Sequence, residues 1–273
     1  MKALNVTRLV YSISDLVPYI NWLYFYFAWQ IKDENMRKKV RKEAEDMLRL
    51  LEKKYHVYAL FSISQANSDG DDILLENGLR LPMLRQQNES QSRKPNLCLA
   101  DFIRPLSTGI PDQVGIFATT VDIGMETDFD NDDYQKMMVQ LLADRLAEAA
   151  AERMHEEVRK TYWGYAPNEH LTMDELHCEK FQGIRPAIGY PSLPDTSLNF
   201  LLSEALGMKN IGIRLTESGA MKPHASVSGL MISHPAAHYF ELGKIGEDQL
   251  RDYAHRRNVP VEMMRKFLGS RIV

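Results

Sequence analysis

Residues 132–160, DDYQKMMVQLLADRLAEAAAERMHEEVRK, decide the fold of this chain. The stretch contains neither glycine nor proline, and most of its residues (Ala, Leu, Met, Glu and Arg) are among the strongest helix formers. The acidic residues in the preceding ETDFDNDDY suit the first turn of a helix, where the helix dipole favours negative charge. The sequence therefore predicts one long helix from about Asp132 to Lys160.

A carboxylate on this helix has an unusual setting. Helical spacing groups four residues on a partly apolar side of the helix: Leu141, Glu148, Ala151 and His155. Glu148 is therefore expected to be less solvated than a typical helix glutamate. The alternative is a surface salt bridge from Glu148 to Arg145 or Arg159, which is common and weak.

A proline-rich loop follows the helix. Residues 183–195 read GIRPAIGYPSLPD, and each proline fixes its own φ and disfavours helix at the residue before it. Gly189 adds a position where φ can be positive or where another group can approach the backbone. The result is a stiff loop that carries the guanidinium of Arg185 and the phenol of Tyr190. It is either a rigid connector or a functional loop.

Several apolar segments predict strands and mark the fold class. Strands are expected in HVYALFSI (56–63), in the DILLE that follows a turn (72–76), in LCLADFI (97–103), in VGIFATTVDI (114–123), in ASVSGLMIS (225–233) and, as a short aromatic strand, in HYFEL (238–242). Gly229 marks a bulge or a close approach. SLNFLLSEALGM (197–208) predicts a helix that ends at Gly207. Strands without regular intervening helices indicate an α+β protein with an antiparallel or mixed sheet.

The N-terminal part is expected to be helical from about residue 14 to 55. Its apolar run LVPYINWLYFYFAWQI (16–31) is too short for a bilayer and is interrupted by Pro18, Asn21 and Gln30. A short helix that is apolar almost all round is expected to be buried. Asn21 then needs hydrogen-bond partners. It is either a satisfied core amide or part of a site.

Composition limits the classes of function. The 273 residues, 44% hydrophobic and 26% charged, suffice for a single domain over residues 1–273. A formal charge of −4 gives no general attraction for nucleic acid, and the sequence predicts no membrane association. The two cysteines, Cys98 and Cys178, and the absence of a leader favour a cytoplasmic protein.

Common catalytic motifs are absent. The sequence contains no G-x-x-x-x-G-K-[ST] phosphate loop, no G-x-G-x-x-G after a strand and no G-x-S-x-G elbow. The histidines at positions 224, 234 and 238, and the His177–Cys178 pair, follow no zinc spacing, so no metal site is expected. A metal-dependent hydrolase built on these histidines is the least favoured alternative.

The long run from Asp144 to Asp195 and the segment LTESGAMKPHASVSGLMISHPAAHYFELGKIGEDQLRDYA (215–254) carry a resemblance to a known family. Together with CLADFI and INWLYFYFAW, they resemble the activation domain of cobalamin-dependent methionine synthase over nearly the whole chain. The resemblance implies a single C-shaped α+β domain with a twisted antiparallel sheet and long helices.

The resemblance also implies a function. In that family, the domain binds S-adenosylmethionine. When the cobalamin has been oxidised to cob(II)alamin, one electron from flavodoxin and the methyl group of S-adenosylmethionine regenerate methylcobalamin. The implied cofactors are therefore S-adenosylmethionine, bound here, and cobalamin, carried by a partner. The implied partners are a cobalamin-binding module and a flavodoxin-like electron donor.

Site residues follow from the same resemblance. Arg185 and the backbone around Ala187 and Gly189 would hold the ligand, Glu148 would lie near the sulfonium, and Tyr190 would face the corrin and help control the ligation of cobalt. Tyr239 and Phe240 match an aromatic pair in the family site.

Two departures from the family pattern matter. The family commonly has aspartate where this chain has Asn21, and Phe240 stands where a second tyrosine can occur. The chain also lacks a D-x-H-x-x-G cobalamin motif, so it is either a domain excised from a longer protein or a separate subunit. We expect the second, acting in trans on a separate synthase. The alternatives are an S-adenosylmethionine-binding regulatory or sensor module, and an activator of another corrinoid methyltransferase.

Overall fold

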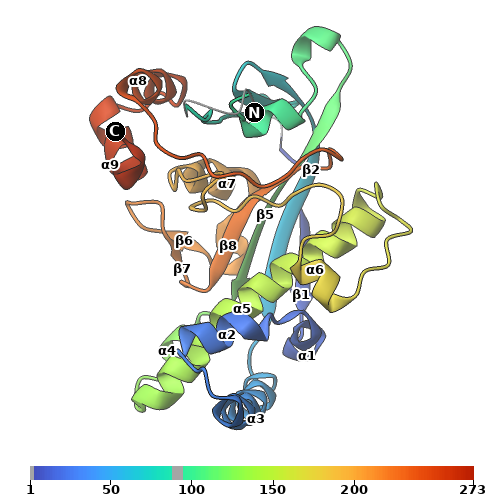
Figure 1. Ribbon diagram of the computed structural model, residues 1–273, viewed down its shortest axis with the longest axis vertical. Helices are drawn as coiled ribbons and strands as arrows, with labels where there is room; N and C mark the ends of the chain where they lie inside the picture. Colours follow the sequence, from blue (N-terminus) through green and yellow to red (C-terminus); the bar gives the residue numbers. More distant parts are fainter. Residues whose placement is uncertain (1–2, 88–94) are drawn as a thin grey trace.

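The computed structural model describes residues 3–87 and 95–273 (Figure 1). Its central element is a six-stranded antiparallel sheet in the order β4-β3-β2-β5-β8, with β1 also paired to β2. A separate two-stranded sheet is made by β6 (Arg214–Leu215) and β7 (Met221–Lys222). The strands of the main sheet are β1 (Thr7–Tyr11), β2 (Val57–Asp69), β3 (Asp72–Leu75), β4 (Arg80–Pro82), β5 (Asp112–Val121) and β8 (Ser226–Met231).

Helices cover the sheet and extend beyond it. The α-helices are α1 (Ile13–Leu16), α2 (Trp22–Ala28), α3 (Glu34–Leu51), α4 (Gly124–Thr127), α5 (Asp133–Glu157), α6 (Met173–His177), α7 (Leu198–Leu206), α8 (Glu247–Arg256) and α9 (Val261–Leu268). Short 3₁₀ segments are η1 (Val17–Tyr19), η2 (Leu99–Phe102), η3 (Leu106–Thr108), η5 (Met208–Ile211) and η6 (Gly269–Arg271), and η4 (Val158–Tyr162) is a π-helix. The predicted α+β class, with an antiparallel sheet and long helices, is confirmed.

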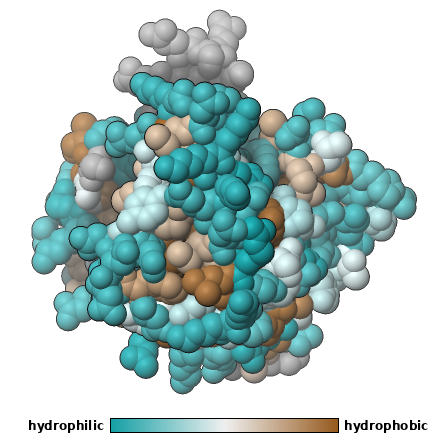
Figure 2. All heavy atoms as spheres, turned by 90° about the horizontal axis from the view of Figure 1, so that it is seen from below, coloured by the Kyte–Doolittle hydropathy of each residue, from teal (hydrophilic) through white to brown (hydrophobic). Residues whose placement is uncertain are grey.

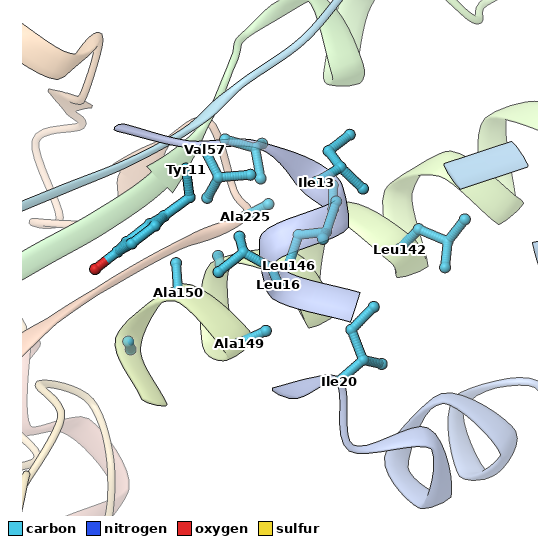
Figure 3. Packing of buried hydrophobic residues seen from close by; sticks show 14 of the residues in the cluster. Tyr11, Ile13, Leu16, Ile20, Val57, Leu142, Leu146, Ala149, Ala150 and Ala225 are labelled. Carbon is cyan, nitrogen blue, oxygen red and sulfur yellow. The ribbon is translucent and has the colours of Figure 1, made fainter. Parts of the chain in front are cut away.

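Both faces of the sheet are buried. Alternate residues of β2 point to opposite sides, so Val57 and Phe61 join a core under α5, whereas Leu60 joins a core under α7. This burial on two sides explains why the central strands read as nearly continuous apolar runs rather than as alternating patterns. In Figure 3, Leu146 of α5 lies beside Leu16 of α1 in the first of these cores.

The predicted long helix is present as α5, which crosses the sheet diagonally in Figure 1. Asp132 caps its N-terminus by accepting a hydrogen bond from the backbone N–H of Gln135. Small alanine side chains on the buried side allow a close approach to the sheet. The hydroxyl of Thr119 on β5 donates to the carbonyl oxygen of Ala147 over 3.0 Å. The helix therefore holds its polar residues at a fixed position along the sheet.

Two of the predicted strands are wrong. LCLADFI contains the 3₁₀ segment η2, because Asp101 accepts a hydrogen bond from the backbone N–H of Cys98 and closes a turn. HYFEL has no regular structure. It runs past the proline-rich loop, and prolines lack the N–H that a strand ladder needs. The N–H of Leu242 donates instead to the carbonyl of Pro191.

The predicted buried helix at residues 16–31 is also wrong. The segment divides into α1, η1 and α2, and α2 exposes Leu23, Tyr24 and Phe27 by 50–60% while Phe25 is fully buried. Figure 2, which views the molecule from the α3 end, shows apolar patches within a largely hydrophilic surface. Within the described residues, no helix combines the length and the apolar content needed to cross a bilayer.

Candidate functional site

A polar cleft lies between α5 and the proline-rich loop. It consists of two adjoining pockets of about 460 and 340 Å³. Four residues line both pockets: Glu148, Glu179, Arg185 and Tyr190. The larger pocket extends to Ala187, Tyr239 and Phe240, and the smaller one extends to Asn21 at the start of α2. The cleft thus brings together every predicted site residue except Gly189, which lies in the loop between Ala187 and Tyr190.

The proline-rich loop is held along the edge of the sheet. Ala187 forms an isolated antiparallel bridge with Gly229 of β8. The hydrogen bonds of this bridge are made by the neighbouring residues, Ile188 N–H to Ser228 O and Leu230 N–H to Pro186 O. In such a pair, the N–H and C=O of Ala187 itself point away from β8. The N–H of Ala187 is therefore offered on the side away from the sheet, whereas its carbonyl oxygen accepts from the N–H of Tyr190 over 3.3 Å.

The guanidinium of Arg185 is held in place by two contacts with α5. It donates to the Glu152 carboxylate over 3.0 Å and to the carbonyl oxygen of Ala151 over 3.1 Å, both on α5. Its side chain is 11% exposed. Burial alone would lower the pKa of Arg185, but Glu152, Tyr239 and Glu148 together outweigh this effect and raise the pKa. Arg185 is therefore a fixed cation in the wall of the cleft.

Glu148 pairs with a phenol and forms neither of the two salt bridges considered from the sequence. Its carboxylate accepts a hydrogen bond of 2.8 Å from Tyr190, whose side chain is 52% exposed at the cleft. Burial and the nearby Glu148 carboxylate both raise the pKa of Tyr190. Arg145 lies over the ring of Tyr24, and Arg159 pairs with Glu169.

The other predicted residues support the loop and close the cleft. Gly189 has a φ of 91°, a backbone angle that residues with a side chain rarely adopt. Its N–H donates to the carbonyl oxygen of Leu193 over 2.8 Å in a tight turn. The hydroxyl of Tyr239 accepts the backbone N–H of Arg185 over 2.9 Å. Burial raises the pKa of Tyr239, so the phenol stays neutral. Phe240 is half-buried beside it.

Asn21 is neither a buried core amide nor a free side chain. It is the N-cap of α2, where its side-chain oxygen accepts the backbone N–H of Leu23 over 3.2 Å. It also lines the smaller pocket, between Tyr19 and Tyr24. Asn21 is therefore placed to contact a ligand while it starts a helix.

Sequence reasoning missed three further carboxylates of the cleft, Glu152, Glu179 and Glu241. Glu152 lies one helical turn after Glu148, so the spacing of four residues could have identified it. Glu179 lies just after α6 with a φ of 56°. Burial, together with the nearby Glu152, raises its pKa. No sequence pattern places Glu179 here, because its position depends on how α6 folds back toward α5.

A buried polar network stands behind the cleft. Arg159 is fully buried and donates to both oxygens of Glu169, while its second terminal nitrogen lies 2.9 Å from Nδ1 of His155. Burial, Arg185 and Arg159 all hold the pKa of His155 well below its usual value. The neutral ring therefore accepts at Nδ1 from Arg159. The guanidinium of Arg159 lies over the ring of Phe181, near the start of the proline-rich loop, and the ring of His155 meets Phe181 edge to face.

The histidines singled out in the sequence are not gathered into one cluster. His224 faces Glu126, and His234 and His238 flank the ring of Phe102. His177 donates from Nε2 to the carbonyl oxygen of Tyr19. Among residues 3–87 and 95–273, no group of three or more histidine, cysteine or acidic side chains could hold a metal ion.

The curved sheet, the helix across it and the cleft beneath the proline-rich loop define an α+β ligand-binding domain. The family model described as vitamin B12 dependent methionine synthase, activation domain, matches residues 12–258, and the chain belongs to this family. A solved structure described as the MetH reactivation domain bound to AdoHcy is similar over 99% of this chain and 91% of that chain. It has 39% sequence identity and a TM-score of 0.93. The resemblance inferred from the sequence is confirmed.

Proposed function

We propose that this chain binds S-adenosylmethionine in the cleft and presents its methyl group to a cobalamin carried by a separate chain. The observation that carries the proposal is the shared cleft of Arg185, Glu148 and Tyr239 in a member of this family. A relative of 39% identity holds S-adenosylhomocysteine, the product of methyl donation. A ligand with a carboxylate, an adenine and a positive sulfonium suits a guanidinium, aromatic rings and a carboxylate.

Each side chain then has a role. The fork of Arg185 binds the carboxylate of the ligand, and the backbone at Ala187 and Gly189 supplies hydrogen bonds. Glu148 attracts the sulfonium, and Tyr239 and Phe240 bring aromatic surface to the same pocket. The half-exposed ring of Tyr190 lies at the cleft surface, where a corrin would approach.

The reaction needs an electron and a methyl group, neither of which comes from this chain itself. One electron from a flavodoxin-like donor and one methyl group from S-adenosylmethionine convert the partner's cob(II)alamin into methylcobalamin and leave S-adenosylhomocysteine. The residues described here bind and orient the methyl donor. The cobalamin-binding module of a methionine synthase is the proposed partner.

Calorimetric titration with S-adenosylmethionine tests this function. We expect saturable binding by the wild-type chain and a loss of at least about tenfold in affinity for Arg185→Ala, because hydrogen bonds to charged groups are worth about 1.5–3 kcal/mol each. Absence of binding by folded wild-type protein would refute the proposal. Binding without methyl transfer to a cobalamin-bearing partner supplied with an electron donor would instead favour a regulatory or sensor module.

We expect Asn21→Asp to bind S-adenosylmethionine up to about tenfold more tightly than the wild type. A carboxylate at this edge of the smaller pocket adds a charge-assisted bond to the ligand's ammonium, worth about 1.5–3 kcal/mol against about 1 kcal/mol for a neutral one. Aspartate caps a helix as well as asparagine does, so α2 should be unaffected. Titration of both proteins checks this, and unchanged or weaker affinity would contradict it.

A further inference from the structure

Glu152 is a buried carboxylate with one oxygen that lacks a hydrogen-bond donor. Its side chain is 13% exposed, and Oε2 accepts from Arg185 over 3.0 Å. Oε1 is buried and has no hydrogen-bond partner among the described residues. An unsatisfied buried carboxylate oxygen is costly and uncommon, so the missing donor calls for an explanation.

The surroundings narrow the choice of donor. Glu152 lines the smaller pocket together with Arg185 and Asn21. The side-chain oxygen of Asn21 is already engaged by the N–H of Leu23, and asparagine carries no charge. A cationic group that enters this pocket therefore meets its strongest acceptor at Glu152 or at another carboxylate of the cleft.

The pairing of Glu152 with Arg185 matches a particular chemical group. Here a carboxylate and a guanidinium lie side by side in hydrogen-bond contact, nearly shielded from solvent. An α-amino acid presents the complementary pair, a carboxylate and an ammonium on one carbon atom. The carboxylate would lie against Arg185 and the ammonium against Glu152.

We propose that Glu152 is a ligand-binding residue whose Oε1 accepts a hydrogen bond from the ammonium of the amino-acid part of the ligand. Glu152 thereby binds the ammonium more strongly than the uncharged Asn21 can. This inference rests on the proposed function. Oε1 is shielded from solvent, but the terminal torsion of a glutamate is soft. A turn about this torsion moves both oxygens, so one of them can face the pocket while the carboxylate stays within reach of Arg185.

The test compares two ligands and two proteins by calorimetric titration. The ligands are S-adenosylhomocysteine and its analogue in which hydrogen replaces the amino group. The proteins are the wild type and Glu152→Gln. Glutamine can still accept from Arg185 through its carbonyl oxygen, but it places an NH₂ donor where Oε1 stood.

We expect removal of the amino group to weaken binding to the wild type about tenfold or more and to weaken binding to Glu152→Gln less than about threefold. The variant should bind the deaminated analogue about as well as the wild type does. Equal losses for both proteins would show that Glu152 only orients Arg185, and this would overturn the inference while the proposed function stands. Failure of the wild type to bind S-adenosylhomocysteine would refute both.

Glu157→Gln is the matched control. Glu157 lies on the same helix and, like Glu152, accepts from an arginine, Arg153. It accepts from Tyr11 as well, and it does not line either pocket. It should respond to removal of the amino group as the wild type does. A thermal melt of each variant verifies that the chain is folded under the titration conditions.

Discussion

Arg159→Ala is expected to lower the free energy of unfolding by about 3–5 kcal/mol. Arg159 is fully buried, and its partner Glu169 is only 10% exposed. Removal of the guanidinium leaves the carboxylate of Glu169 in poorly hydrated surroundings without its cation. It also removes the donor to His155 and the cation that stacks on Phe181. Several losses at one buried position explain the large effect.

Urea or thermal unfolding of the whole chain measures this effect. Arg49→Ala on α3 is the control, because Arg49 and its partner Asp46 are 69% and 57% exposed. An exposed pair of this kind contributes between zero and about 1 kcal/mol. If Arg159→Ala is no more destabilising than Arg49→Ala, Glu169 must find solvent or another partner, and the buried network would not support the fold.

Local sequence patterns predicted the elements that depend on local physics. The long helix was predicted from its composition alone, because its residues are strong helix formers and Asp132 provides a cap. Gly207 ends α7 with a φ of 66°, as expected of a C-terminal glycine. Gly229 was expected to mark a bulge or a close approach, and the backbone of Pro186 lies against it.

Patterns failed where the outcome depended on distant contacts. LCLADFI has the composition of a short strand, and only its turn through Asp101 makes it a 3₁₀ segment. The apolar residues 16–31 were expected to be buried, but α2 contacts α5 on one side only and leaves Phe27 60% exposed. Total hydrophobicity does not reveal which sides of a helix find a partner.

The candidate site shows the same division. Residues named from the family resemblance, such as Arg185 and Glu148, meet in one cleft, but their immediate partners were not predicted. Glu148 was expected to be poorly solvated or paired with an arginine, whereas it accepts from Tyr190 across 42 residues of sequence. The approach of the loop to α5 decides this pairing, and no local pattern encodes that approach.

Gly229→Ala should displace the proline-rich loop and weaken ligand binding by at least about tenfold. A Cβ at this position would overlap the carbonyl oxygen of Pro186 and lie 2.9 Å from the Cα of Ala187, both backbone atoms of the loop. Backbone gives way less easily than the tip of a side chain, so the loop must move away from β8. Arg185 moves with it, and errors of about 1 Å in the position of a binding group are costly.

The same substitution should lower the free energy of unfolding by about 1–3 kcal/mol, as overpacking of a buried site does.

The variant Gly115→Ala separates the loss of stability from the loss of ligand affinity. Gly115 lies on β5, where the nearest atoms to a Cβ belong to Met231, which it would crowd, and to Trp163, and not to the proline-rich loop. It should destabilise the chain while it retains ligand affinity. Calorimetric titration and unfolding of both variants give the comparison. Equal affinities for Gly229→Ala and Gly115→Ala would mean that the loop tolerates displacement, and that the bridge to β8 does not set the position of Arg185.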